Sequence, residues 1–87
     1  MGQVNQFALT GSLLRSARAL IEISAAELAS ESGVGERTIL RAEQTNGPVV
    51  MRPSNLASIL SALEGRGVVF LAADMTGGPG IRLARDR

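Results

Sequence analysis

Arginine is the residue type through which this chain could do chemistry. All nine basic residues among the 87 are arginines, and the chain has no lysine, histidine or cysteine. Arg37 and Arg41 would stand one turn apart in a helix, so their guanidinium groups could share one side of it. A guanidinium holds its donors in a planar fork that suits phosphate oxygens and the edge of guanine. Genomic base composition explains an all-arginine set equally well.

Catalytic chemistry is hard to build from the remaining residues. Without cysteine or histidine there is no disulfide, no usual zinc ligand set and no imidazole to activate a serine. The acidic residues are scattered along the chain rather than clustered. The Gly-Pro-rich segment 76–80 has no lysine and no strand-to-helix context, so we interpret it as a turn and not as a phosphate loop. The sequence therefore predicts a protein that is not an enzyme and that has no metal or other cofactor.

Length and charge limit what the chain can bind. A chain of 87 residues predicts one domain with a modest core. A net charge of +1 means that nucleic-acid binding would need positive charge gathered on one face. Two aromatic residues are too few for a base-stacking platform. The apolar runs are far shorter than the ~18 residues of a bilayer span, and no secretory signal is visible. We expect no membrane contact and a cytoplasmic location, that of a bacterial cytoplasm or nucleoid.

Four helices are predicted, at residues 11–22, 24–32, 35–44 and 53–64. Thr10 is a suitable cap for the first helix. Ser24 and Glu27 form the sequence pattern of a capping box at the start of the second. Gly33 suits the position that ends a helix, where the backbone adopts a left-handed conformation. Val34, the apolar residue of the turn that follows, is expected to point into the core.

The third predicted helix should be exposed over much of its surface. Ile39 and Ala42 are the residues that we expect to face inward, and they make a single narrow stripe. A short helix with one buried stripe is held in place by its neighbours. Its remaining surface is then free, as a docking helix requires.

The end of the chain changes from helical to strand-like composition. Residues 68–72 are rich in β-branched and aromatic types, and residues 81–85 alternate apolar and basic side chains, so we predict a β-hairpin. An isolated hairpin is marginal in water and needs a surface, either these helices or a second copy of the chain. At the other end, residues 1–9 are predicted to be a flexible lead-in in which Phe7 and Leu9 could fold back on the core. The patch at residues 49–51 could cover the core or form a dimer contact.

Two helices joined by a glycine-centred turn, with two more closing a small core, are the plan of a helix-turn-helix DNA-binding domain. Segment 10–67 resembles the lambda-repressor-like, Cro/C1-type helix-turn-helix family, also called the XRE family, and a set of specific residues carries this resemblance. Those residues are Arg18, the Ala-Glu-Leu-Ala run at 26–29, Gly33, Val34, Thr38, Ile39, Arg41, Glu43, Pro53 and Ser54. The tail, 68–87, is similar to an extension found on some small bacterial members. The fold expected is mainly α, a four-to-five-helix domain with a C-terminal β-hairpin that could serve dimerisation.

The resemblance implies that the helix at 35–44 lies in the major groove of DNA and that its first residues meet base edges. The base contacts implied are those of Glu36, Arg37, Thr38 and Arg41. The implied contacts to the DNA backbone are those of Ser24, Ala25, Thr45, Asn46 and Arg52. Family members often carry a glutamine at the position of Ala25, so Ser24 and the backbone amides would have to serve there instead. The resemblance also implies a structural salt bridge between Arg18 and Glu43.

Two classes of function remain open from the sequence. The first is a sequence-specific transcriptional regulator of double-stranded DNA, expected to be a repressor and a homodimer on two half-sites. The second is an antitoxin-like or other protein-interaction module, with a protein partner bound through the hairpin and DNA binding secondary. Arg37 and Arg41 could also be ordinary solvated charges. Glu36, which should repel phosphate, is either a base reader or only a helix-start residue.

Overall fold

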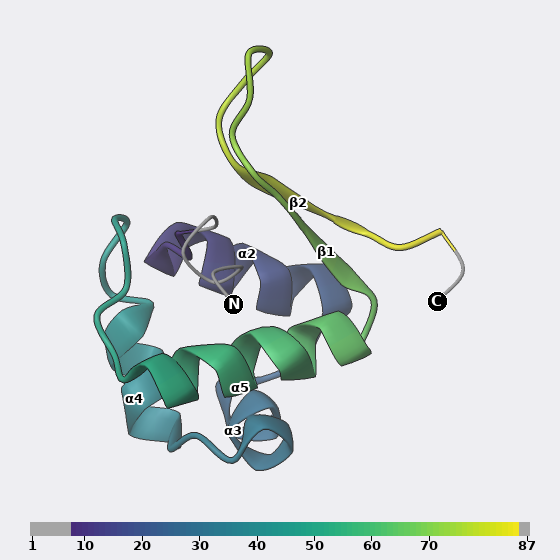
Figure 1. Cartoon of the computed structure of the whole chain (residues 1–87). Helices are drawn as coiled ribbons and strands as arrows, with labels where there is room; N and C mark the ends of the chain where they lie inside the picture. The colour runs from purple at the N-terminus through teal and green to yellow at the C-terminus, as the bar shows by residue number, and fades with distance from the viewer. Residues whose placement is uncertain (1–7, 86–87) are drawn as a thin grey trace.

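Four helices and a hairpin make up residues 8–85, the part of the chain that our computed structural model describes (Figure 1). The helices are α2 (Gly11–Ile21), α3 (Ala25–Ser32), α4 (Glu36–Ala42) and α5 (Pro53–Gly65), and the strands are β1 (Val68–Leu71) and β2 (Gly80–Leu83). The predicted mainly α fold with a C-terminal hairpin is confirmed. Most of the predicted lead-in, including Phe7, lies outside the described residues.

Local capping chemistry sets the starts of α2 and α3, as predicted. The N–H of Leu13 donates to the Thr10 hydroxyl at 3.1 Å. At α3 the N–H of Glu27 donates to the Ser24 hydroxyl at 3.0 Å, and the N–H of Ser24 donates to the Glu27 carboxylate at 2.8 Å. Gly33 adopts a left-handed φ of 76° and ends α3. These short-range bonds satisfy amides that a helix end would otherwise leave unpaired.

Several predicted boundaries were one or two residues wrong. α4 ends at Ala42 rather than at residue 44, because the N–H of Gln44 bonds to the Arg41 carbonyl at 3.2 Å and tightens the last turn. α2 ends at Ile21, and Glu22, expected inside the helix, takes a left-handed φ of 58°. The strands are also shorter than predicted, since pairing stops at Leu71 and Leu83.

The core is formed by one face of each helix together with the root of the hairpin. Its fully buried large side chains are those of Leu14, Leu28, Ile39, Ile59, Leu63 and Val68. Val34 is buried in the turn between α3 and α4, as expected, and Leu9 folds back on the core with 2% of its surface exposed. α3 packs against both α4 and α5. No helix among residues 8–85 has the length and apolar character to cross a bilayer.

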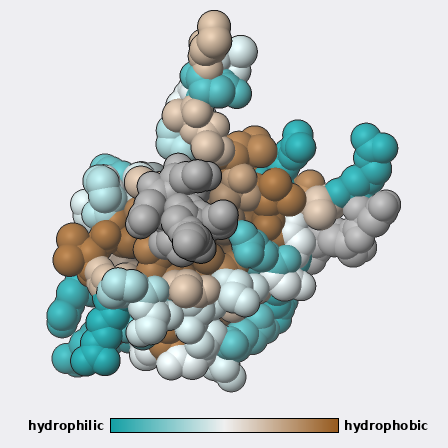
Figure 2. All heavy atoms as spheres, in the orientation of Figure 1, coloured by the Kyte–Doolittle hydropathy of each residue, from teal (hydrophilic) through white to brown (hydrophobic). Residues whose placement is uncertain are grey.

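The hairpin is fastened to the helices at its root and extends away from them at its tip (Figure 1). β1 contacts α5 and β2 contacts α2. The antiparallel register pairs Phe70 with Ile81, and both side chains pack against the core. Figure 2 shows hydrophobic residues gathered where the hairpin meets the helical body. At the far end the Asp74 carboxylate accepts the Thr76 hydroxyl at 2.7 Å and the Thr76 N–H at 2.8 Å, and these bonds lower the pKa of Asp74.

A surface ion pair joins α3 to the end of α5. The Arg66 guanidinium donates two hydrogen bonds to the Glu31 carboxylate, one of them from Nε to Oε1 at 2.9 Å. These bonds lower the pKa of Glu31 and raise that of Arg66. A lowered carboxyl pKa contributes stability above the unfolded-state pKa, and that contribution is lost as the pH falls through the folded-state pKa.

We therefore expect the Glu31 carboxyl to titrate at a lower pH in the wild-type protein than in the Arg66→Gln variant. Following side-chain carboxyl carbon shifts by NMR during an acid titration measures both midpoints. The Asp74 midpoint is the internal control, because its carboxylate is held by Thr76 and should not respond to Arg66. Equal Glu31 midpoints in the two proteins would show that the pair has no influence in solution.

Gly11 marks a close approach between α2 and the segment that follows α4. Its N–H donates to the Gly47 carbonyl at 3.0 Å. A methyl group added at Gly11 would lie 1.8 Å from the Thr45 carbonyl oxygen and 2.6 Å from that of Ala42. Both neighbours are backbone atoms, so no side-chain rotation can relieve the clash. Glycine at this position thus allows the first turn of α2 to touch the end of α4.

Gly11→Ala is expected to lower the free energy of unfolding by about 1–3 kcal/mol, the usual cost of overpacking. Chemical denaturation with an unchanged m value measures the loss. Gly65→Ala is the matched control, because it also lies in a helix but has open space around the added methyl. That variant should keep or slightly gain stability through helix propensity. If Gly11→Ala were as stable as Gly65→Ala, the close approach of Gly11 to the Thr45 carbonyl would be refuted.

Candidate nucleic-acid interface

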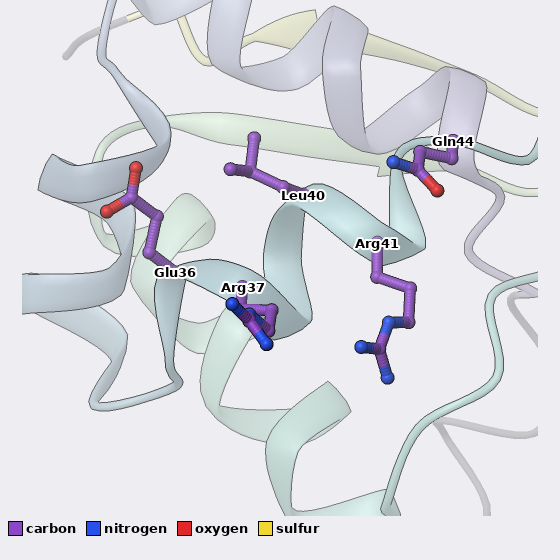
Figure 3. A pocket seen from close by; sticks show the side chains of 5 residues that line it. All are labelled: Glu36, Arg37, Leu40, Arg41 and Gln44. Atoms are coloured by element: carbon purple, nitrogen blue, oxygen red, sulfur yellow. The ribbon is translucent and has the colours of Figure 1, made fainter.

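The outward surface of α4 is an open depression of about 480 Å³, lined by Glu36, Arg37, Leu40, Arg41 and Gln44 (Figure 3). The helix exposes these residues because its other side, with Ile39 and Ala42, is buried in the core. The predicted single inward stripe is therefore present. Figure 2 shows strongly hydrophilic residues at its lower left, where Figure 1 places α4.

Arg37 and Arg41 stand one turn apart on α4 without a partner. Neither guanidinium forms a hydrogen bond or salt bridge with any described residue, whereas Arg15, Arg18 and Arg66 all do. In Figure 3 the carboxylate of Glu36 points away from both guanidinium groups. Their donors are consequently free for a ligand, and no internal bond has to break before they bind one.

A second groove of about 500 Å³ lies between α4 and the loop that follows it. Its lining residues are Thr38, Arg41, Ala42, Thr45, Val50, Met51, Arg52 and Asn55. Arg41 lines both the depression on α4 and this second groove, and so lies on the ridge between these two grooves. The two grooves together contain three exposed arginines, and Glu36 is the only acidic residue that lines either one. Positive charge is thus gathered on this face of a chain with a net charge of only +1.

Six of the nine residues predicted to contact DNA line these two grooves, and the other three, Ser24, Ala25 and Asn46, do not. The hydroxyl and N–H of Ser24 are both used in the capping box. Ala25 has 6% of its surface exposed, so its side chain has little surface to offer a ligand. The Ser24 hydroxyl accepts the N–H of Glu27 and keeps its own O–H proton, so contacts at the start of α3 are left to that proton and to backbone amides.

Asn46 is held inside a network that the sequence did not predict. Its side-chain oxygen accepts from Arg15 at 2.8 Å and from Ser12 at 3.2 Å. Arg15 also donates to the carbonyl oxygen of Glu43, at the end of α4. A cation there satisfies carbonyl groups and suits the negative end of the helix dipole. Arg15 thus fixes the loop that carries Thr45, and Asn46 retains only its amide nitrogen for a ligand.

Arg18 forms the ion pair that was expected with Glu43. Two bonds of 2.7 Å join the guanidinium to both carboxylate oxygens, and a third, of 3.0 Å, runs from Arg18 to the carbonyl of Ile23. The hydrogen bond to Glu43 raises the pKa of Arg18. Since Glu43 is 6% exposed, the pair lies behind α4 and not on its open face. Arg15 and Arg18 lie three residues apart on α2, a spacing that could have indicated that both reach the same helix end.

The described residues contain no group of three histidine, cysteine, aspartate or glutamate side chains that could hold a metal ion. The two grooves offer hydrogen-bond donors, a few acceptors and apolar surface. No protein-family model matches the sequence, and a search of curated proteins finds no match either.

Proposed function

We propose that this protein is a sequence-specific regulator that binds double-stranded DNA by placing α4 in the major groove, and that the domain is of the lambda-repressor-like helix-turn-helix type. The observation that carries the proposal is the pair of unpartnered arginines, Arg37 and Arg41, on the open face of a short helix. A three-residue turn joins this helix to α3. The major groove is about 12 Å wide and admits an α-helix.

The rigid mounting of α4 supports this assignment. Ile39 and Ala42 anchor the helix from behind, and Glu43 ties its end to α2. Binding then has to order only the exposed side chains, which lowers the entropic cost of association. Arg37 and Arg41 suit the O6 and N7 acceptors of guanine, and Glu36 can accept from the amino group of cytosine.

The second groove supports contacts to the DNA backbone. Arg52 and Thr45 line it beside Arg41, at the same face of the molecule. Such contacts fix the position of a protein on the duplex without reading its sequence. Thr38 lies in this groove as well, where it can meet a phosphate or a thymine methyl group.

The small size of this surface supports a homodimer, and we propose that this dimer acts as a repressor. One domain with few contacts and a net charge of +1 should bind weakly, and two copies on half-sites about one helical turn apart would add their contacts. A regulator of this kind works in the cytoplasm, where the DNA of a bacterium lies.

Selection from a randomised pool of DNA duplexes tests the proposal directly. We expect an enriched sequence that the full-length protein binds in fluorescence anisotropy, with an affinity that falls steeply as salt rises. An inverted repeat bound by two protomers indicates a dimer, and a single half-site bound by one indicates a monomer. A pool without any enriched sequence, together with no binding at low salt, would refute DNA recognition.

One observation favours a second candidate, a protein-interaction module. Met75 is fully exposed at the hairpin tip, where the hydrogen bonds of Asp74 order the turn. Leu71 is also exposed on the same hairpin. A partner protein, bound by this chain as an antitoxin-like module, could cover these side chains. The Met75→Ser variant separates the two candidates, because it should weaken protein association and leave binding to a selected duplex unchanged.

A further inference from the structure

Leu40 is an apolar side chain placed among the polar residues of the open α4 face. It has 43% of its surface exposed and does not join the core, although it follows the fully buried Ile39. In Figure 3 its side chain projects outward between those of Glu36 and Gln44. Arg37 and Arg41, its neighbours in the depression, carry the charge that suits DNA.

The fully buried core does not require a leucine at this position. A polar residue would satisfy α4 equally well, because the inward side of the helix is already filled by Ile39 and Ala42. The flanking residues at i−4 and i+4, Glu36 and Gln44, are polar and exposed. A solvated helix face normally carries polar side chains throughout. Leu40 therefore fits a ligand that offers an apolar group among polar ones.

The major groove offers such a group in the C5 methyl of thymine, which stands among hydrogen-bond donors and acceptors on the base edges. We propose that Leu40 contacts a thymine methyl group and so determines part of the DNA sequence that this protein prefers. The inference rests on the proposed DNA-binding function. It adds an apolar reader to the polar side chains Glu36, Arg37, Thr38 and Arg41.

The test removes the methyl group from the DNA and leaves base pairing intact. A duplex obtained by selection with the full chain is remade with each thymine replaced in turn by deoxyuridine. We expect the wild-type protein to lose about three- to fivefold in affinity at one thymine per half-site, the fold-change equivalent to burying one methyl-sized group. The other thymines should tolerate the replacement.

Variants of the protein assign that loss to Leu40. Leu40→Ser should bind the thymine and deoxyuridine duplexes equally, whereas Leu40→Met, which keeps an apolar side chain, should still prefer thymine. Leu40 is exposed, and a matching thermal unfolding midpoint verifies that each variant is folded.

The possible failures are distinguishable. If a sequence is selected but wild-type binding ignores every deoxyuridine, the inference about Leu40 is overturned and the proposed function stands. A thymine preference that persists in Leu40→Ser would assign the methyl contact to another residue. If no sequence is enriched, the proposed function fails and the role of Leu40 fails with it.

Discussion

Replacing Arg37 and Arg41 together by alanine is expected to weaken binding to a selected duplex by at least about 30-fold. Each bidentate contact to a base contributes about 1–3 kcal/mol of discrimination, and 1.4 kcal/mol corresponds to a factor of ten. Both side chains are exposed and unpaired with other described residues, so their removal leaves the packing of α4 intact. The measurement is an anisotropy titration at one fixed salt concentration, accompanied by thermal unfolding.

The matched control is the Arg82→Ala/Arg85→Ala variant. It removes the same two positive charges, from +1 to −1 overall, at exposed positions in and just after β2. In Figure 1, β2 and the chain that follows it lie away from α4, which is at the left of the view. This control should keep most of its affinity for the selected duplex if direct contacts, rather than net charge, govern binding. Equal losses in the two variants would mean that Arg37 and Arg41 act only through charge.

The parts of the fold that the sequence predicted well are those set by neighbouring residues. Ser24 and Glu27 form a capping box within three positions, and Gly33 needs only its own backbone to end α3. Ile39 and Ala42 reveal the buried side of α4 by their spacing alone. Such short-range signals do not depend on where the rest of the chain lies.

Features that depend on contacts distant in sequence were not predictable. Gly11 meets the Thr45 carbonyl and Arg15 meets Asn46 only because the loop after α4 lies over the start of α2. The patch at residues 49–51 was predicted either to cover the core or to form a dimer contact, and neither alternative fits all three residues. Val49 and Met51 pack against the core, while Val50 is 95% exposed, as expected when successive side chains of an extended segment face opposite sides.

The sequence placed both the charged residues and the apolar residue of the candidate site outside the buried stripe of α4, but it proposed a contact to DNA only for the charged ones. Charged residues on a short helix suggest a ligand by their type, so Arg37 and Arg41 were identified from sequence. Leucine is usually a core residue, so a ligand role for Leu40 was not proposed although the spacing of Ile39 and Ala42 left it outside the buried stripe; the folded chain adds that 43% of its surface is exposed. The exposed fraction of an apolar side chain depends on how the whole chain packs around it.

The largest effect on stability is expected for Arg18→Ala. Glu43 is the only charged side chain buried among the described residues, and both of its carboxylate oxygens bond to Arg18. Removing one partner of a buried pair leaves the other charge without compensation, at a cost of about 3–5 kcal/mol. A loss of that size should lower the unfolding midpoint by more than about 10 °C in a domain of this length.

A double variant without either charge separates the ion pair from the other contacts of Arg18. Arg18→Leu/Glu43→Met removes both charges and keeps apolar volume, so it should be more stable than Arg18→Ala, because no buried charge is left unpaired. If the double variant were as unstable as Arg18→Ala, the bond from Arg18 to the Ile23 carbonyl would be the important one. At a temperature where Arg18→Ala remains folded, its affinity for a selected duplex should fall far less than that of the Arg37→Ala/Arg41→Ala variant. The pair would then act by holding the end of α4 in place, and the open face of that helix would remain the part that meets DNA.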